Sequence, residues 1–215
     1  MNDILTFEET RVIGSLIEKE LTTPEYYPLT VNALKNACNQ KSNRDPVVSF
    51  DESIIENTLD KLREKSFASR ITGSDIRVPK YRQVFTEAMN FSHEEIAVIC
   101  VLMLRGPQTP GEIKSRSSRM FNFGNLTQVD DVLQKLMNRE KPLIIKLPRQ
   151  TGMKESRYMH ILSVEPEIDT PVNEIKDISS NNDDRITKLE AEFESLNNDV
   201  NEIKTKFEKF KQQFE

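Results

Sequence analysis

This sequence has few residues that could act as a nucleophile or a base in catalysis, and their spacing does not match a catalytic triad. Cys38 lies in the polar stretch ACNQKSNRDP (37–46) and could act as a nucleophile. A cysteine nucleophile needs an adjacent base, and the two histidines are His93, in a helix-start motif, and His160, in a predicted terminal strand. No triad spacing results. We therefore predict that the protein is not an enzyme, with no catalytic residues, metal or cofactor.

Other candidate sites are explained by ordinary structure. Asp130 and Asp131 could suggest a metal pair, but adjacent residues on a helix do not face one another, and acidic residues are common in a first turn. Six glycines form no phosphate-binding loop. Cys38 and Cys100 lack the spacing of a zinc cluster or a disulfide framework. Cys100, within IAVICVLM, is predicted to lie in the core.

The stretch 37–46 is predicted to be a structured turn between two helices. Asn39 can end a helix in the left-handed conformation, and Asn43 or Asp45 can bond local backbone. Pro46 then favours an extended chain. Its two cations are not explained by turn chemistry, and we predict that they contact phosphate or a partner carboxylate.

Cations in this stretch and at three later places could contact nucleic-acid phosphate. The candidate nucleic-acid-binding residues are Lys41, Arg44, Arg77, Lys80, Lys114, Arg116, Arg119, Arg149, Lys154 and Arg157. Serines lie between the cations of residues 114–119, and their hydroxyl groups are better suited to contacts with the nucleic-acid backbone than to recognition of bases. The alternative for all of them is solvated surface or intramolecular ion pairing.

The elements that carry these residues come from an internal repeat. TFEETRVIGSLI begins at residue 6 and SHEEIAVICVLM at residue 92, and the same offset of 86 superposes Thr23-Pro24 on Thr109-Pro110. Both segments open with a capping box, as does TPGE at residue 109. The first helix of each copy is predicted to bury positions at helical spacing: Val12, Ile13, Leu16 and Ile17, and Ile96, Ile99, Cys100 and Met103.

Each copy continues with the same predicted order of elements. A second helix covers VNALKNACN in the first copy and begins at Thr109 in the second, after a break at Gly106. The third helices, ESIIENTLDKLREKSF and TQVDDVLQKLMNRE, turn inward Ile55, Leu59 and Leu62, and Val129, Val132 and Leu136. A strand, a turn with Gly73 or Gly152 and a second strand follow. The pattern predicts an α+β, mostly helical fold: two tandem winged helix-turn-helix domains, residues 1–88 and 89–165.

These segments also resemble a known family. ETRVIGSLIEKELTTPEYYPLTVNALKNACNQKSNRDPV, LMLRGPQTPGEIKSRSSRMFNF and KESRYMH are similar to the YceH family of bacterial proteins over residues 4–164. The resemblance implies a tandem winged-helix protein, without an established biochemical activity.

The C-terminal segment has a regular apolar pattern. Apolar residues recur at alternating spacings of three and four: Ile186, Leu189, Phe193, Leu196, Val200, Ile203, Phe207, Phe210 and Phe214. This pattern predicts a helix over 185–215 that self-associates as a coiled coil, or alternatively packs on its own body. Residues 166–184 are predicted to be a flexible polar linker. The net charge of −5 comes from this region, because 23 Lys and Arg face 22 Asp and Glu in residues 1–165.

Three functions follow as hypotheses. The fold favours a DNA-associated, regulatory protein. However, residues 51–65 carry five acidic against three basic residues, and residues 127–140 carry three against two. The third helices, which normally contact DNA bases in the major groove, are therefore poorly suited to that contact. The alternative is a protein-interaction scaffold, and an enzyme using Cys38 is the least favoured. Residues 1–10 lack a signal-peptide pattern, and the longest apolar run, 96–104, is too short for a bilayer, so a cytoplasmic location is expected.

Overall fold

The computed structural model describes residues 5–73, 77–149 and 155–163. All of the described residues lie within one compact unit. The predicted linker at 166–184 and coiled-coil helix at 185–215 therefore lie outside the described residues. In the described part the fold is α+β, with seven α-helices and two small antiparallel sheets.

The first half of the described unit contains three main helices and a three-stranded sheet. Its elements are α1 (Phe7–Thr22), the 3-10 helix η1 (Pro24–Tyr26), β1 (Leu29–Thr30), α2 (Val31–Cys38), α3 (Glu52–Glu64), β2 (Ala68–Ile71) and β3 (Lys80–Gln83). The strand order is β1-β3-β2, and both pairs are antiparallel. Strand β1 has only two residues, which is too short to show the alternation by which strands are recognised in sequence.

The second half repeats the helices with a smaller sheet. A short helix, α4 (Phe85–Ala88), leads into α5 (His93–Arg105), α6 (Pro110–Ser117), α7 (Leu126–Met137), β4 (Ile144–Lys146) and β5 (Tyr158–His160). Strands β4 and β5 pair antiparallel, with Ile144 opposite His160.

Local chemistry places the helix starts where the sequence predicts them. All three capping boxes form, with both hydrogen bonds present, at Thr6–Glu9, Ser92–Glu95 and Thr109–Glu112. Gly106 ends α5 with φ of +67°, a conformation that costs glycine little. The predicted left-handed residue in the turn is different: Asn39 has φ of −89°, whereas Asn43 has φ of +63°.

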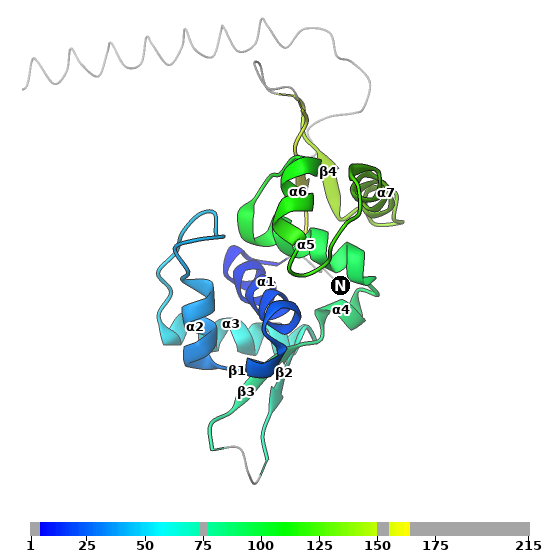
Figure 1. Cartoon of the computed structure of the whole chain (residues 1–215). Helices are drawn as coiled ribbons and strands as arrows, with labels where there is room; N and C mark the ends of the chain where they lie inside the picture. Colours follow the sequence, from blue (N-terminus) through cyan, green and yellow to red (C-terminus); the bar gives the residue numbers. More distant parts are fainter. Residues whose placement is uncertain (1–4, 74–76, 150–154, 164–215) are drawn as a thin grey trace, which may run out of the picture. The chain divides into compact units, whose positions relative to one another are not determined.

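The two repeats share one hydrophobic core, and α1 and α5 form its centre (Figure 1). Gly14 on α1 allows the close approach, because a Cβ there would lie 2.9 Å from Leu104 Cδ2 and 3.3 Å from Met103 Cβ. Helices α2 and α3 pack on α1, while α6 and α7 pack on α5. The predicted inward residues of the first and third helices are all buried. The predicted boundary between 1–88 and 89–165 stays a prediction.

Candidate anion-binding cleft

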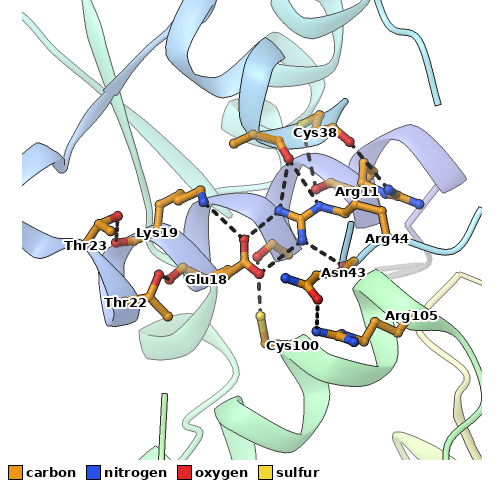
Figure 2. A network of polar contacts seen from close by, with 12 residues as sticks. Arg11, Glu18, Lys19, Thr22, Thr23, Cys38, Asn43, Arg44, Cys100 and Arg105 are labelled. Atoms are coloured by element: carbon orange, nitrogen blue, oxygen red, sulfur yellow. Dashed lines mark hydrogen bonds and ion pairs between the residues drawn. The ribbon is translucent and has the colours of Figure 1, made fainter. Parts of the chain in front are cut away.

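The turn at 37–46 is built around Arg44, whose side chain has no exposed surface. Its guanidinium binds the Glu18 carboxylate through both terminal nitrogens, at 2.6 Å from Nη2 to Oε2 and 3.1 Å from Nη1 to Oε1 (Figure 2). Nε and Nη2 also donate to the carbonyl oxygen of Ala37, near the end of α2. The prediction that Arg44 contacts phosphate or a partner carboxylate does not fit these contacts, because its side chain is enclosed; the structure shows the alternative, an ion pair within the chain.

A second arginine lies under the same turn. Arg11, on α1, is 1% exposed and donates to the carbonyl oxygens of Pro46, at 2.7 Å, and Cys38, at 3.5 Å. Burial, and then the charge of Arg44, lowers the Arg11 pKa. The turn thus follows a fixed path over two buried cations. It also encloses Cys38, and burial raises the pKa of that thiol to about 11.

The other end of the turn contacts the second half of the unit. Asn43 Oδ1 accepts a hydrogen bond from Arg105 Nη2 at 2.6 Å, and the backbone N–H of Asp45 donates to the Leu104 carbonyl at 2.8 Å. The positive φ of Asn43 turns the chain at this point. Lys41, two residues earlier, is exposed and lines the same hollow as Arg116 of α6.

A cleft of about 390 Å³ lies where α1, this turn, the end of α5 and α6 meet. Five cations line it: Lys19, Lys41, Arg105, Arg116 and Arg119. Among the described lining residues the one carboxylate is that of Glu18. We call this hollow the seam cleft.

The one carboxylate of the seam cleft is already neutralised. Burial alone would raise the Glu18 pKa, but the hydrogen bonds and charge of Arg44 outweigh burial and lower it. Lys19 adds a weak contact to the same carboxylate at 3.6 Å. Glu18 therefore cannot balance the cations on the other walls of the cleft.

Those cations are only partly compensated by other groups. Arg105 is half-buried and bonds a neutral amide, and its pKa is lowered first by burial and next by the charge of Arg116. Arg116 bonds Gln108 and lies 3.4 Å from a Glu112 oxygen. Within the described residues Lys41 and Arg119 are exposed and form no ion pair. An anion in the seam cleft would relieve this repulsion.

A second cavity of about 410 Å³ adjoins the seam cleft and shares Asn43, Arg105 and Arg116 with it. Arg157 lines this cavity but is engaged, donating to Glu112 Oε2 at 2.9 Å and to the Pro107 carbonyl at 2.8 Å. For Arg157 the structure thus shows the intramolecular ion pair that the sequence left open as the alternative.

The remaining candidate cations do not join the seam cleft. Arg77 and Lys80 lie on the β2–β3 hairpin, and Arg149 is exposed beyond β4. Lys114 donates to the Gly124 carbonyl at 3.2 Å. Lys154 lies outside the described residues.

Two lining residues of the seam cleft, Lys19 and Arg105, were not predicted as site residues. Each occupies the last turn of a helix, where a cation is ordinarily explained by the helix dipole. Their position in the cleft depends on how the two halves of the unit pack together, which the sequence does not show.

Comparison with known proteins places the chain in a family. A family model described as "Protein of unknown function, DUF480" matches residues 5–153. The chain belongs to the DUF480 family. Its relatives include UPF0502 proteins of Koribacter versatilis, 49% identical over 91% of this chain and 92% of the relative, and of Pelobacter propionicus, 45% identical over the full length of both. The UPF0502 protein of Geobacter sulfurreducens is 45% identical, also over the full length of both. The resemblance to the YceH family is confirmed.

Two further observations bear on function in this DUF480 protein. Among the described residues, no group of three or more His, Cys, Asp or Glu is placed to hold a metal ion. No helix in the described ranges combines the length and the apolar character that crossing a membrane requires.

Proposed function

We propose that this DUF480 protein associates with duplex DNA through phosphate contacts at the seam cleft. In this proposal α1–α3 with the β2–β3 hairpin, and α5–α7 with β4–β5, are two winged helix-turn-helix units joined through α1 and α5. DNA association agrees with the expected cytoplasmic location.

The observation that supports this proposal is that candidate cations distant in sequence line the same cleft. Lys41, in the turn after α2, lines the same hollow as Arg116 and Arg119 at the end of α6. Lys19 and Arg105 complete the set. A cluster of cations with one already neutralised carboxylate is the type of surface that attracts a phosphate backbone.

The third helices support backbone contact over base reading. On α3 and its N-cap the acidic side chains point to solvent: Asp51, Glu52, Glu56, Asp60 and Glu64 are all exposed. On α7 Asp130 and Asp131 are exposed too. These carboxylates would repel phosphate if either helix entered a major groove. Binding is therefore expected to be tolerant of sequence.

Self-association through residues 185–215 is the second part of the proposal. It rests on the apolar repeat in the sequence. An oligomer would present several seam clefts to one duplex, so that weak contacts add to a useful affinity.

The exposed acids of α3 support a second candidate, in which a basic partner protein binds that helix. A protein-interaction scaffold of this kind would recover a stoichiometric partner in a pull-down and leave DNA unbound.

The test uses two exposed residues whose side chains form no ion pair in the described structure. Lys41→Glu/Arg119→Glu should lower the affinity for a fluorescent duplex at least about tenfold in an anisotropy titration, because two phosphate contacts become repulsions. Lys61→Glu/Lys141→Glu is the matched control, since both lysines are exposed away from the seam cleft and the charge change is identical. Loss of DNA binding in the control alone would contradict the proposed surface and implicate α3.

A further inference from the structure

The seam cleft has a floor and a rim that differ in exposure. We call the half-buried pair Arg105 and Arg116 the floor, and the exposed pair Lys41 and Arg119 the rim. A volume of about 390 Å³ falls within the range typical of small-molecule pockets. A DNA backbone crossing the rim needs no such hollow beneath it.

Each of the two floor guanidiniums donates to the oxygen of a neutral amide. Asn43 Oδ1 accepts from Arg105 without neutralising its charge, and Gln108 Oε1 accepts from Arg116, which also forms an ion pair with Glu112. The nearest carboxylate to Arg116, that of Glu112, lies at 3.4 Å and also binds Arg157. Pre-oriented guanidinium pairs of this kind fit the paired oxygens of a phosphate group.

We propose that the floor of the seam cleft binds a small molecule that carries two linked phosphates. One phosphate group would lie between Arg105 and Arg116, and the second would extend toward Lys41 and Arg119. Two linked phosphates balance the charge of these four cations better than one phosphate does, because a single dianion would leave about two positive charges without a counter-charge. Since these residues come from both halves of the unit, the bound ligand would link the 37–46 turn to α6.

The diphosphate site lies in the same cleft as the proposed DNA contacts, so the ligand would compete with DNA for that cleft. The binding step itself does not depend on DNA. A diphosphate on the floor would neutralise the charge that attracts DNA to the rim, so DNA affinity should fall as the ligand saturates the cleft.

Isothermal titration calorimetry of the full-length chain with inorganic pyrophosphate tests the proposal, at an ionic strength held constant with potassium chloride. The expected result is saturable binding at one site per chain, with orthophosphate at least about tenfold weaker. Adenosine diphosphate is the second arm: equal affinity would assign recognition to the diphosphate alone, and tighter binding would show that the nucleoside is also held. An absence of saturable pyrophosphate binding, or equal affinity for orthophosphate, would overturn the proposal.

Two variants locate the site. Arg105→Met/Arg116→Met should lower pyrophosphate affinity about 100-fold, at roughly tenfold for each charged contact. Because removal of both side chains can also disturb the packing of the two halves, Asn43→Asp is the second variant. Its carboxylate would replace the amide oxygen already 2.6 Å from Arg105, and aspartate tolerates the left-handed conformation. This variant should keep or raise the melting temperature and lose at least about tenfold in pyrophosphate affinity. Unchanged affinity in Asn43→Asp would refute the floor as the site.

The two proposals fail separately. If Lys41→Glu/Arg119→Glu loses DNA while the unmodified chain ignores pyrophosphate, the DNA proposal stands and the ligand proposal falls. If pyrophosphate binds and the floor variants lose it while no DNA is bound at low salt, the reverse holds.

Discussion

Replacement of Arg44 by methionine should destabilise the protein strongly. The substitution keeps much of the side-chain volume and removes the guanidinium. It leaves the Glu18 carboxylate, 16% exposed, without its two-point partner, and it removes two donors from the Ala37 carbonyl. Breaking one side of a buried ion pair costs about 3–5 kcal/mol, because the remaining charge is left unpaired.

We expect a value near the lower limit, about 3 kcal/mol, because Glu18 keeps some contact with water and with Lys19. For a unit of this size the loss corresponds to a fall of about 6–12 °C in melting temperature. Urea unfolding followed by circular dichroism measures the free energy directly. The control is Arg44→Met/Glu18→Met, which leaves no unpaired charge and should recover a large part of the loss.

The pH dependence checks the electrostatic cause. In the native chain Arg44 holds the Glu18 pKa below its ordinary value, so this pair stabilises the fold above the unfolded pKa, and the contribution is lost as the pH falls through the folded pKa. In Arg44→Met burial acts on that carboxyl with only Lys19 to oppose it, and the Glu18 pKa should rise. The stability gap between the two proteins should therefore be larger at about pH 7 than at about pH 4. A gap below about 1 kcal/mol, or a gap independent of pH, would refute the reasoning.

Three other outcomes test the packing and the buried groups. Gly14→Val should cost about 1–3 kcal/mol in urea unfolding, since the added Cβ alone would lie 2.9 Å from Leu104 Cδ2; an unchanged midpoint would contradict the close approach of α1 and α5. Burial raises the Cys38 pKa to about 11, so this thiol should react with a disulfide reagent at about pH 8 only after denaturation, and rapid native labelling would count against its enclosure. Burial lowers the His160 pKa to about 4 from its ordinary 6.5. As the pH drops between these values, the imidazole is protonated in the unfolded chain but not in the folded one, so the free energy of unfolding should fall. His160→Leu should remove a slope of up to about 1.4 kcal/mol per pH unit, and an unaltered slope would show that His160 is not the group responsible.

Features decided by a few neighbouring residues could be predicted from the sequence. A capping box depends on four consecutive residues, and the boxes beginning at Thr6, Ser92 and Thr109 all form. The apolar residues predicted to face inward on α1, α3, α5 and α7 are all buried, although α1 also buries Arg11 and Ser15, which apolar spacing does not indicate. Strand β1 and helix α4 were not predicted, because two and four residues are too few for a period to show.

The seam cleft could be predicted only in part. Lys41, Arg116 and Arg119 were identified as cations, but their convergence depends on how the two halves pack. The sequence leaves open whether Arg44 contacts phosphate, a partner carboxylate or a carboxylate of its own chain, because Glu18 lies 26 residues away on another helix and an ion pair between elements leaves no spacing pattern. The left-handed residue of the turn is Asn43 and not the predicted Asn39. The side chain of Asn39 instead hydrogen-bonds to the backbone N–H and carbonyl of Phe50.

The salt dependence of duplex-DNA affinity tests the central claim most directly. Phosphate contacts by the five cations of the seam cleft predict a slope of log affinity against log salt of about −4.5 for each cleft engaged, and Lys41→Glu/Arg119→Glu should make it shallower by about two per cleft. No DNA binding at low salt, or the same slope in both proteins, would contradict the assignment of the seam cleft as the DNA surface.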